Sequence, residues 1–257
     1  MEEIYYNLLL DEKEIKIKAR YGYMNNQKYI NEQMRAILID WIIEVHFHFK
    51  LNEETLFQTV WIIDTYLTYQ IIPRNKLQLL GITSLLIACK YNEIYYPSNN
   101  KLINITNNAY EVKDLLQMER EVLEKLEFNI MSPNPMIFYD IISKSFNFNK
   151  KQYNLGIYFL ESSLIDYHMI KFPSSIIALS CAYIVMKFFC LKNYIYLYNI
   201  SNICNKVNNN EQPKLIKESA KNLCILVKNI NNSNLQAIKT KYSLKQFDNV
   251  VQFCENK

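Results

Sequence analysis

Two charged residues in apolar helical patterns are the first candidates for chemistry. Lys90 ends the apolar run "LLIACK", and Glu119 lies on a stripe with Leu115 and Val122. A carboxylate buried alone on such a stripe costs several kcal/mol, so Glu119 needs a donor or an interface. We expect Lys90 to be its neighbour, and the two could form an acid–base pair or cap free backbone groups of another chain. Alternatively, Lys90 simply extends into solvent at a helix end.

Arg35 and Asp64 raise the same question, because each lies in a mostly apolar helix, in "QMRAIL" and "WIIDTYL". We predict a structural pair between these helices, and no catalysis need follow.

Signatures of enzymes and metal sites are otherwise absent from the sequence. No phosphate-binding loop or nucleophile elbow occurs, and the chain has 3 glycines in all. His46 and His48 are two residues apart, which points them to different sides of a helix, and His168 stands alone. The 6 cysteines show no C-x-x-C spacing and are predicted to be reduced thiols of the core, typical of an intracellular protein. We expect no metal and no cofactor.

The composition indicates an all-α fold and argues against several partners. Half of the 257 residues are hydrophobic, and Gly and Pro number only 3 and 6, too few for a sandwich or barrel. The net charge of +4 is dispersed, which argues against nucleic acid. Apolar runs are too short to span a membrane, and the start "MEEIYYNLLLDEKE" is acidic, unlike a secretory signal. We therefore expect a protein of the nucleus and cytoplasm.

Helical periodicity predicts two series of helices separated by Pro133 and Pro135. After a leading helix near 2–13, the predicted helices lie near 31–49, 53–68, 75–91, 98–105 and 111–127, then near 135–146, 150–168, 174–190, 194–206, 212–230 and 233–241. The third members, "GITSLLIACKY" and "SSIIALSCAYIVMK", mix small and large apolar residues, typical of a central helix. The predicted domains are a lead-in at 1–30, a first domain at 31–132 and a second at 133–257.

The stretch "MRAILIDWIIEVH" carries apolar residues on two faces. One face contains Met34, Ile37, Leu38, Trp41 and Val45, and the opposite one contains Ala36, Ile39, Ile43 and Phe47. Either this helix is buried all round, or the first face is an exposed docking groove with Glu44 at its rim.

These segments together resemble a known family. "MRAILIDWIIEVH", "LQLLGITSLLIACKYNEIYYP" and "LLQMEREVLEKLEFNI" resemble the cyclin box of mitotic cyclins, and "SLIDYHMIKFPSSIIALSCAYIVMK" and "AIKTKYSLKQFDNV" resemble their C-terminal box and tail. The "YHMIKFP" and "ACKYNE" segments are closer to B-type than to A-type cyclins. The resemblance covers about residues 2–250 and implies two tandem five-helix boxes with a short helix at each end. It also implies a non-catalytic regulatory subunit that binds and activates a cyclin-dependent protein kinase by holding its αC helix and activation segment in the active arrangement.

The resemblance also assigns roles to residues. The family's signature positions match Arg35, Asp64, Leu79, Lys90 and Glu119. The implied kinase-binding residues are Lys90, Glu119, Ile87, Tyr91, Leu123, Phe128 and Ile130, with Ile4 in the leading helix. The implied substrate-docking patch, which would receive Arg-x-Leu peptides of substrates or inhibitors, consists of Met34, Ile37, Leu38, Trp41, Glu44, Arg74, Leu77 and Gln78.

Some positions depart from the family pattern. Asn92 replaces a usual acidic residue, which would weaken a charge contact with the kinase, Thr65 replaces a common arginine, and Tyr96 a common proline. Mitotic cyclins usually carry a long N-terminal region with a destruction box, whereas Met1 here lies almost at the first predicted helix, so either the chain is shortened or its turnover is controlled otherwise. "RAIL" fits Arg-x-x-Leu, but a helix should hide it.

Two other functions stay open at this point. A cyclin-like transcriptional scaffold of the transcription factor IIB type would need a basic stripe, and the lysines are dispersed. A small helical enzyme that uses Glu119 and Lys90 as acid and base would need a cavity lined by further polar groups.

Overall fold

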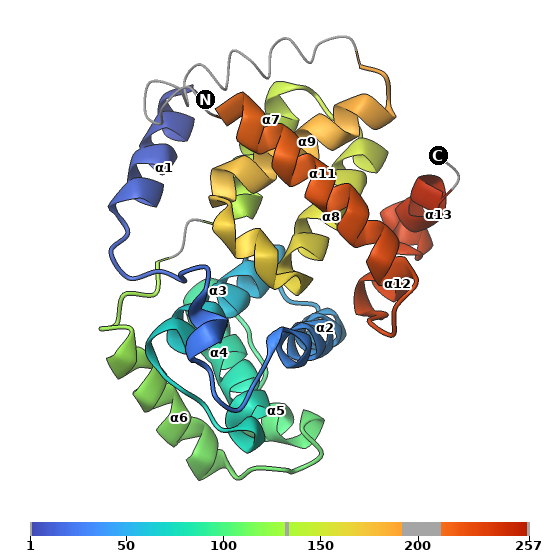
Figure 1. Cartoon of the computed structure of the whole chain (residues 1–257). Coiled ribbons are helices and arrows are strands. Elements are labelled where there is room, and N and C mark those ends of the chain that lie inside the picture. Colours follow the sequence, from blue (N-terminus) through green and yellow to red (C-terminus); the bar gives the residue numbers. More distant parts are fainter. Residues whose placement is uncertain (1, 132–133, 192–211, 256–257) are drawn as a thin grey trace. The chain divides into compact units, whose positions relative to one another are not determined.

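A computed structural model describes residues 2–131, 134–191 and 212–255, and these consist of helices and their connections (Figure 1). They divide into two compact units. The N-terminal unit comprises Lys16–Ser132, and the C-terminal unit comprises Pro133–Lys257 together with Met1–Ile15. The predicted all-α, two-unit architecture is confirmed. The predicted lead-in at 1–30 is divided between the units at Ile15.

The N-terminal unit is built around one central helix, α4 (Figure 1). Its elements are η1 (Tyr23–Asn26), α2 (Glu32–Phe49), α3 (Glu53–Tyr69), η2 (Arg74–Lys76), α4 (Leu77–Asn92), α5 (Asn99–Ile105) and α6 (Val112–Lys125). Every residue of α4 from Leu79 to Cys89 is buried. Helix α2 approaches α4 closely at Gly81, where a Cβ atom would lie only 2.8 Å from Leu38 Cδ1. The small residue is therefore needed for the packing of these two helices.

A buried ionic cluster joins η1, α2 and α3. Arg35 Nε and Nη2 donate to the Asp64 carboxylate at 2.6 and 2.7 Å, and the Tyr23 hydroxyl donates to Asp64 Oδ1 at 2.8 Å. Burial lowers the pKa of Arg35, but the charge and hydrogen bonds of Asp64, with a smaller contribution from Tyr23, together outweigh it, so the pKa lies above its usual value. Gln27 Nε2 donates to the carbonyls of Leu67 and Gln70 at 2.7 Å. These contacts attach the segment after Lys16 to the N-terminal unit.

The C-terminal unit has the same central-helix plan, with α9 in the middle. Its elements are α1 (Glu2–Glu14), α7 (Pro135–Ser145), α8 (Lys150–Ile165), η3 (Tyr167–Lys171), α9 (Ser174–Phe188), α11 (Gln212–Asn231), α12 (Ala237–Tyr242), η5 (Lys245–Phe247) and α13 (Val250–Glu255). Tyr5 of α1 packs edge-on against Phe138, and Glu12 accepts hydrogen bonds from Ser175 N and Oγ at 3.1 and 2.6 Å. Glu12 thus caps the first turn of α9, because free N–H groups and a positive partial charge lie there.

Two predicted helices have different bounds in the structure, and one observed helix was not predicted. The predicted helix at 150–168 ends at Ile165, because Asp166 begins a 3-10 turn by accepting from His168 N at 2.9 Å. The predicted helix at 233–241 begins only at Ala237, since Ser233 forms a turn in which its Oγ accepts from Leu235 N. Helix α13 was not predicted. The predicted helix at 194–206 lies outside the described residues.

Candidate partner-binding site

The structure brings Lys90 and Glu119 together at the edge of the N-terminal unit. Lys90 lies in the last turn of α4, and its Nζ donates to Glu119 Oε1 of α6 at 2.6 Å. The side chains are 40% and 12% exposed. Such a partly exposed pair contributes at most about 1 kcal/mol to stability. The ammonium has further donors and the carboxylate a second oxygen, so the pair can still bind polar groups of a partner.

Exposed apolar side chains come from the same two helix ends. Tyr91 follows Lys90 and is 54% exposed, and Phe128 follows α6 and is 68% exposed. Leu123 and Ile130 are half-buried. Phe128 has a left-handed backbone with φ 57°, and its N–H donates to Leu123 O at 2.8 Å, so the turn that ends α6 projects the ring outward.

Ile87 was predicted to contact the kinase, but the structure places its side chain in the core of the N-terminal unit. Ile87 is 2% exposed, because α4 is surrounded by other helices and has no free face at this turn. Ile4, which is 59% exposed, belongs to α1 of the C-terminal unit.

Further exposed residues were missed by the sequence reasoning. Ile94 and Tyr95 are 87% and 90% exposed, and Tyr96 and Met131 are also exposed. The run "IYYP" directly after a helix was the available signal, since three large apolar residues outside a helix rarely face water without a function. The adjacent Glu93 fixes the start of this run, because its carboxylate accepts from Asn52 N and Nδ2 at 2.7 Å and from Thr55 Oγ1.

The family resemblance assigns the surface around Lys90 and Glu119 to contact with a kinase, and we therefore call it the kinase-facing surface. It is defined by Lys90, Glu119, Tyr91, Ile94, Tyr95, Leu123, Phe128 and Ile130.

The predicted docking patch is narrower than expected. Ile37 is 55% exposed, and Met34 and Trp41 are half-buried beside the exposed Glu44. Leu38 was predicted to be open, but it is 5% exposed because its side chain packs on Gly81. From the α4 end of the patch, Arg74 is exposed, Gln78 is half-buried and Leu77 is buried.

The opposite face of α2 belongs to the core. Ile39 and Ile43 are fully buried, while Ala36 and Phe47 are half-buried. The helix is thus neither buried all round nor open along a whole face; a strip through Met34, Ile37, Trp41 and Glu44 remains accessible.

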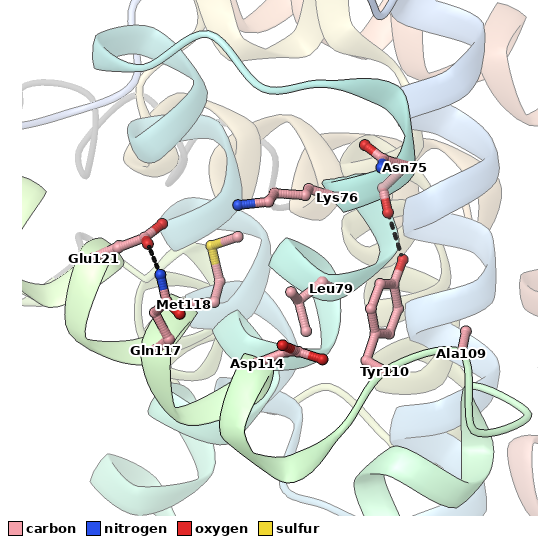
Figure 2. A pocket seen from close by; sticks show the side chains of 9 residues that line it. All are labelled: Asn75, Lys76, Leu79, Ala109, Tyr110, Asp114, Gln117, Met118 and Glu121. Atoms are coloured by element: carbon pink, nitrogen blue, oxygen red, sulfur yellow. Dashed lines mark hydrogen bonds between the residues drawn. The ribbon is translucent and has the colours of Figure 1, made fainter.

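A pocket of about 430 Å³ lies between the start of α4 and α6 (Figure 2). Its lining residues are Asn75, Lys76, Leu79, Ala109, Tyr110, Asp114, Gln117, Met118 and Glu121. The Tyr110 hydroxyl donates to Asn75 O, Gln117 donates to Glu121, and Asp114 accepts from Glu111 N. The hydrogen-bonding groups named here are thus engaged within the unit. The lining also combines the cationic Lys76 with the acidic Asp114 and Glu121, so it defines no single class of ligand.

The cysteines of the described residues are free thiols. Cys89 and Cys181 are buried as expected, and burial with the nearby Glu93 raises the pKa of Cys89 to about 12. Cys190 is exposed, so the prediction of a core thiol is wrong there. Cys204 lies outside the described residues. No His, Cys, Asp or Glu cluster suited to a metal ion occurs in the described part of the chain. None of its helices is both long and apolar enough to cross a bilayer.

Family comparisons divide the chain at the same boundary near residues 131–133, although they group residues 3–15 with the N-terminal match. The model described as "Cyclin, N-terminal domain" matches residues 3–131, and "Cyclin, C-terminal domain" matches residues 133–256. The chain therefore belongs to the cyclin family.

Within that family its similarity is to the B-type, mitotic cyclins. It is 39% identical over 233 residues to the G2/mitotic-specific cyclin-B of Spisula solidissima, covering 90% of this chain and 52% of that protein. It is 45% identical over 161 residues to Cyclin-B2-1 of Oryza sativa subsp. japonica, covering 63% and 38%. The chain thus matches about half or less of the length of these curated relatives.

Solved structures support the same fold. A viral cyclin from herpesvirus saimiri superposes with a TM-score of 0.72 at 18% identity, over 86% of this chain and 97% of that one. A chain of the yeast RNA polymerase II CTD kinase complex CTDK-1 gives 0.64 at 15% identity, over 83% and 73%.

Proposed function

We propose that this chain is a regulatory subunit that binds and activates a cyclin-dependent serine/threonine protein kinase in mitotic control, with no catalysis of its own. The observation that carries the proposal is the Lys90–Glu119 pair beside exposed apolar residues on a rigid unit. The family membership and the mitotic relatives support it. We further propose that the chain acts in the nucleus and cytoplasm.

The proposed mechanism is a shift in the population of a two-state kinase. An active kinase needs its αC glutamate paired with the β3 lysine, and a surface that contacts only the inward αC position favours that state. A shift from 1:99 to 99:1 requires about 5.5 kcal/mol of differential binding. Burying a single large apolar side chain contributes about 1.5–3 kcal/mol, so Phe128, Ile94 and Tyr95 together contribute about 4.5–9 kcal/mol, a range that includes the required value. Lys90 and Glu119 then fix the register by hydrogen bonds to free backbone groups.

The docking patch extends the proposal to substrates. Glu44 would pair with the arginine of an Arg-x-Leu peptide, and Ile37 with Trp41 would receive the leucine. Docking there would raise the effective concentration of substrate at the kinase without changing the chemistry.

The test is the affinity of a purified mitotic cyclin-dependent kinase for Lys90→Ala/Glu119→Ala. Removing both partners avoids an unpaired charge in the free protein, so we expect unchanged cooperative unfolding and binding at least about 30-fold weaker. The matched control is Lys171→Ala/Glu218→Ala, which removes an exposed ion pair of the C-terminal unit and should bind normally. Full binding by the first double variant would contradict the assignment of the site.

A further inference from the structure

A chain of side-chain amides that passes through α3 connects two segments of the kinase-facing surface, the end of α4 and the segment after α6. Asn92 Nδ2, at the end of α4, donates to Gln58 Oε1 of α3 at 2.6 Å. Gln58 Nε2 in turn donates to the backbone carbonyl of Ile130, after α6, at 2.9 Å. Gln58 is only 4% exposed, so little water reaches these groups.

We call these two hydrogen bonds, from Asn92 to Gln58 and from Gln58 to Ile130, the relay. The last acceptor, the Ile130 carbonyl, determines which groups of the relay donate and which accept. A backbone carbonyl can only accept, so Gln58 must turn its NH₂ group toward Ile130 and its oxygen toward residue 92. Residue 92 must then donate. An asparagine can do so, whereas an ionised aspartate cannot. Aspartate would force the Gln58 amide to flip, and its oxygen would then face the Ile130 carbonyl, placing two acceptors in contact.

The segment held by the relay needs this restraint. Glu127 and Phe128 both have left-handed backbones, with φ 52° and 57°, a conformation that side chains with a Cβ adopt at a cost. The turn closes where Asn129 N donates to Leu126 O at 2.8 Å, and Gln58 then holds the next residue. The relay therefore secures the path on which the exposed Phe128 ring depends.

We propose that Asn92 and Gln58 are positioning residues that hold the Phe128–Ile130 segment in the conformation that the kinase binds. This rests on the proposed function, since it gives that surface its partner. The asparagine at position 92 therefore does more than remove a charge contact with the kinase. Through Gln58 its side chain holds the segment that follows α6.

The test compares Asn92→Asp, Gln58→Met and the double variant by two measurements. Amide hydrogen exchange of residues 128–131 in the free protein reports the segment without any kinase. The affinity of the kinase reports the surface. We expect Asn92→Asp to speed exchange about tenfold and to weaken binding about tenfold, equivalent to about 1.4 kcal/mol. Asn100→Asp, which adds the same charge at an exposed position of α5, should change neither.

The Gln58→Met background separates the relay from a direct charge effect. Methionine lacks the amide, so aspartate at position 92 should there have no further effect on exchange or binding. If Asn92→Asp weakens kinase binding equally in the unmodified chain and in Gln58→Met, the aspartate repels the kinase directly. If Asn92→Asp leaves amide exchange unchanged, the segment does not need the relay. Either result overturns the proposal. If the unmodified chain fails to bind the kinase, the proposed function fails, while exchange still decides whether the relay holds the segment.

Discussion

The buried ion pair of the C-terminal unit gives a sharp prediction of stability. Lys241 Nζ of α12 donates to Glu161 Oε1 of α8 at 2.6 Å, with side chains 4% and 0% exposed. The second oxygen, Glu161 Oε2, has no hydrogen-bond partner among the described residues. Lys241→Met would remove the donor and leave a charged carboxylate in the core. Breaking such a pair costs about 3–5 kcal/mol.

The size of the expected change makes it measurable by calorimetry. A domain of this size loses about 2–4 °C in Tm per kcal/mol, so Lys241→Met should lower the Tm of the C-terminal unit by about 6–20 °C. Both tryptophans, Trp41 and Trp61, lie in the N-terminal unit, so their fluorescence shows whether that unit stays folded when the C-terminal unit is destabilised. Lys245→Met, at an exposed lysine of η5, should stay within about 0.5 kcal/mol.

A second variant decides whether the unpaired charge is the cause. Glu161→Met/Lys241→Met removes both charges and keeps the volume apolar, so it should recover most of the loss. If Lys241→Met costs less than about 1 kcal/mol, or if the double variant is as unstable as the single one, the reasoning from a desolvated charge is refuted.

Two further predictions concern the accessible surface. Ile37→Ala should raise the KM of the kinase complex for substrates bearing Arg-x-Leu about fivefold, because the leucine loses part of an apolar contact, while a short peptide without the motif is phosphorylated as before. Equal loss on both substrates would show that the strip is not a docking site. Maleimide labelling read by mass spectrometry should modify the exposed Cys190 before Cys89 and Cys181, because these two side chains are buried and their raised pKa values keep them as protonated thiols. Labelling of Cys89 in the folded protein at the same rate would contradict this.

Charge patterns predicted two ion pairs of the N-terminal unit. Glu119 on an apolar stripe required a donor, and Arg35 and Asp64 in apolar helices required each other, because isolated charges are costly in a core. Both contacts are present in the structure. Helix periodicity similarly located α2 and α4, since long apolar patterns leave few alternatives.

What the sequence did not reveal depends on contacts between distant segments. Gln58 and Asn92 are separated by 34 residues, and nothing in either local pattern links them to the Ile130 carbonyl. The burial of Leu38 depends on Gly81, because a residue without a side chain lets α2 and α4 approach closely enough for Leu38 to pack directly on α4. Likewise, the family resemblance placed Ile87 among the contact positions but could not show that it is buried. Its burial follows from the helices that surround α4.

The packing of helix α4 bears on whether the two proposed surfaces of the N-terminal unit are coupled. Leu77 and Gln78 at its start border the docking patch, and Lys90 at its end carries the kinase-facing pair. Twelve helical residues separate them by about 18 Å at 1.5 Å per residue. Because the intervening residues are buried in close packing, α4 has no room to slide or rotate between states. If both proposed surfaces are correct, a rigid spacer of this kind would fix the geometry of docking and transmit no signal, so we expect Ile37→Ala to leave the affinity for the kinase itself unchanged.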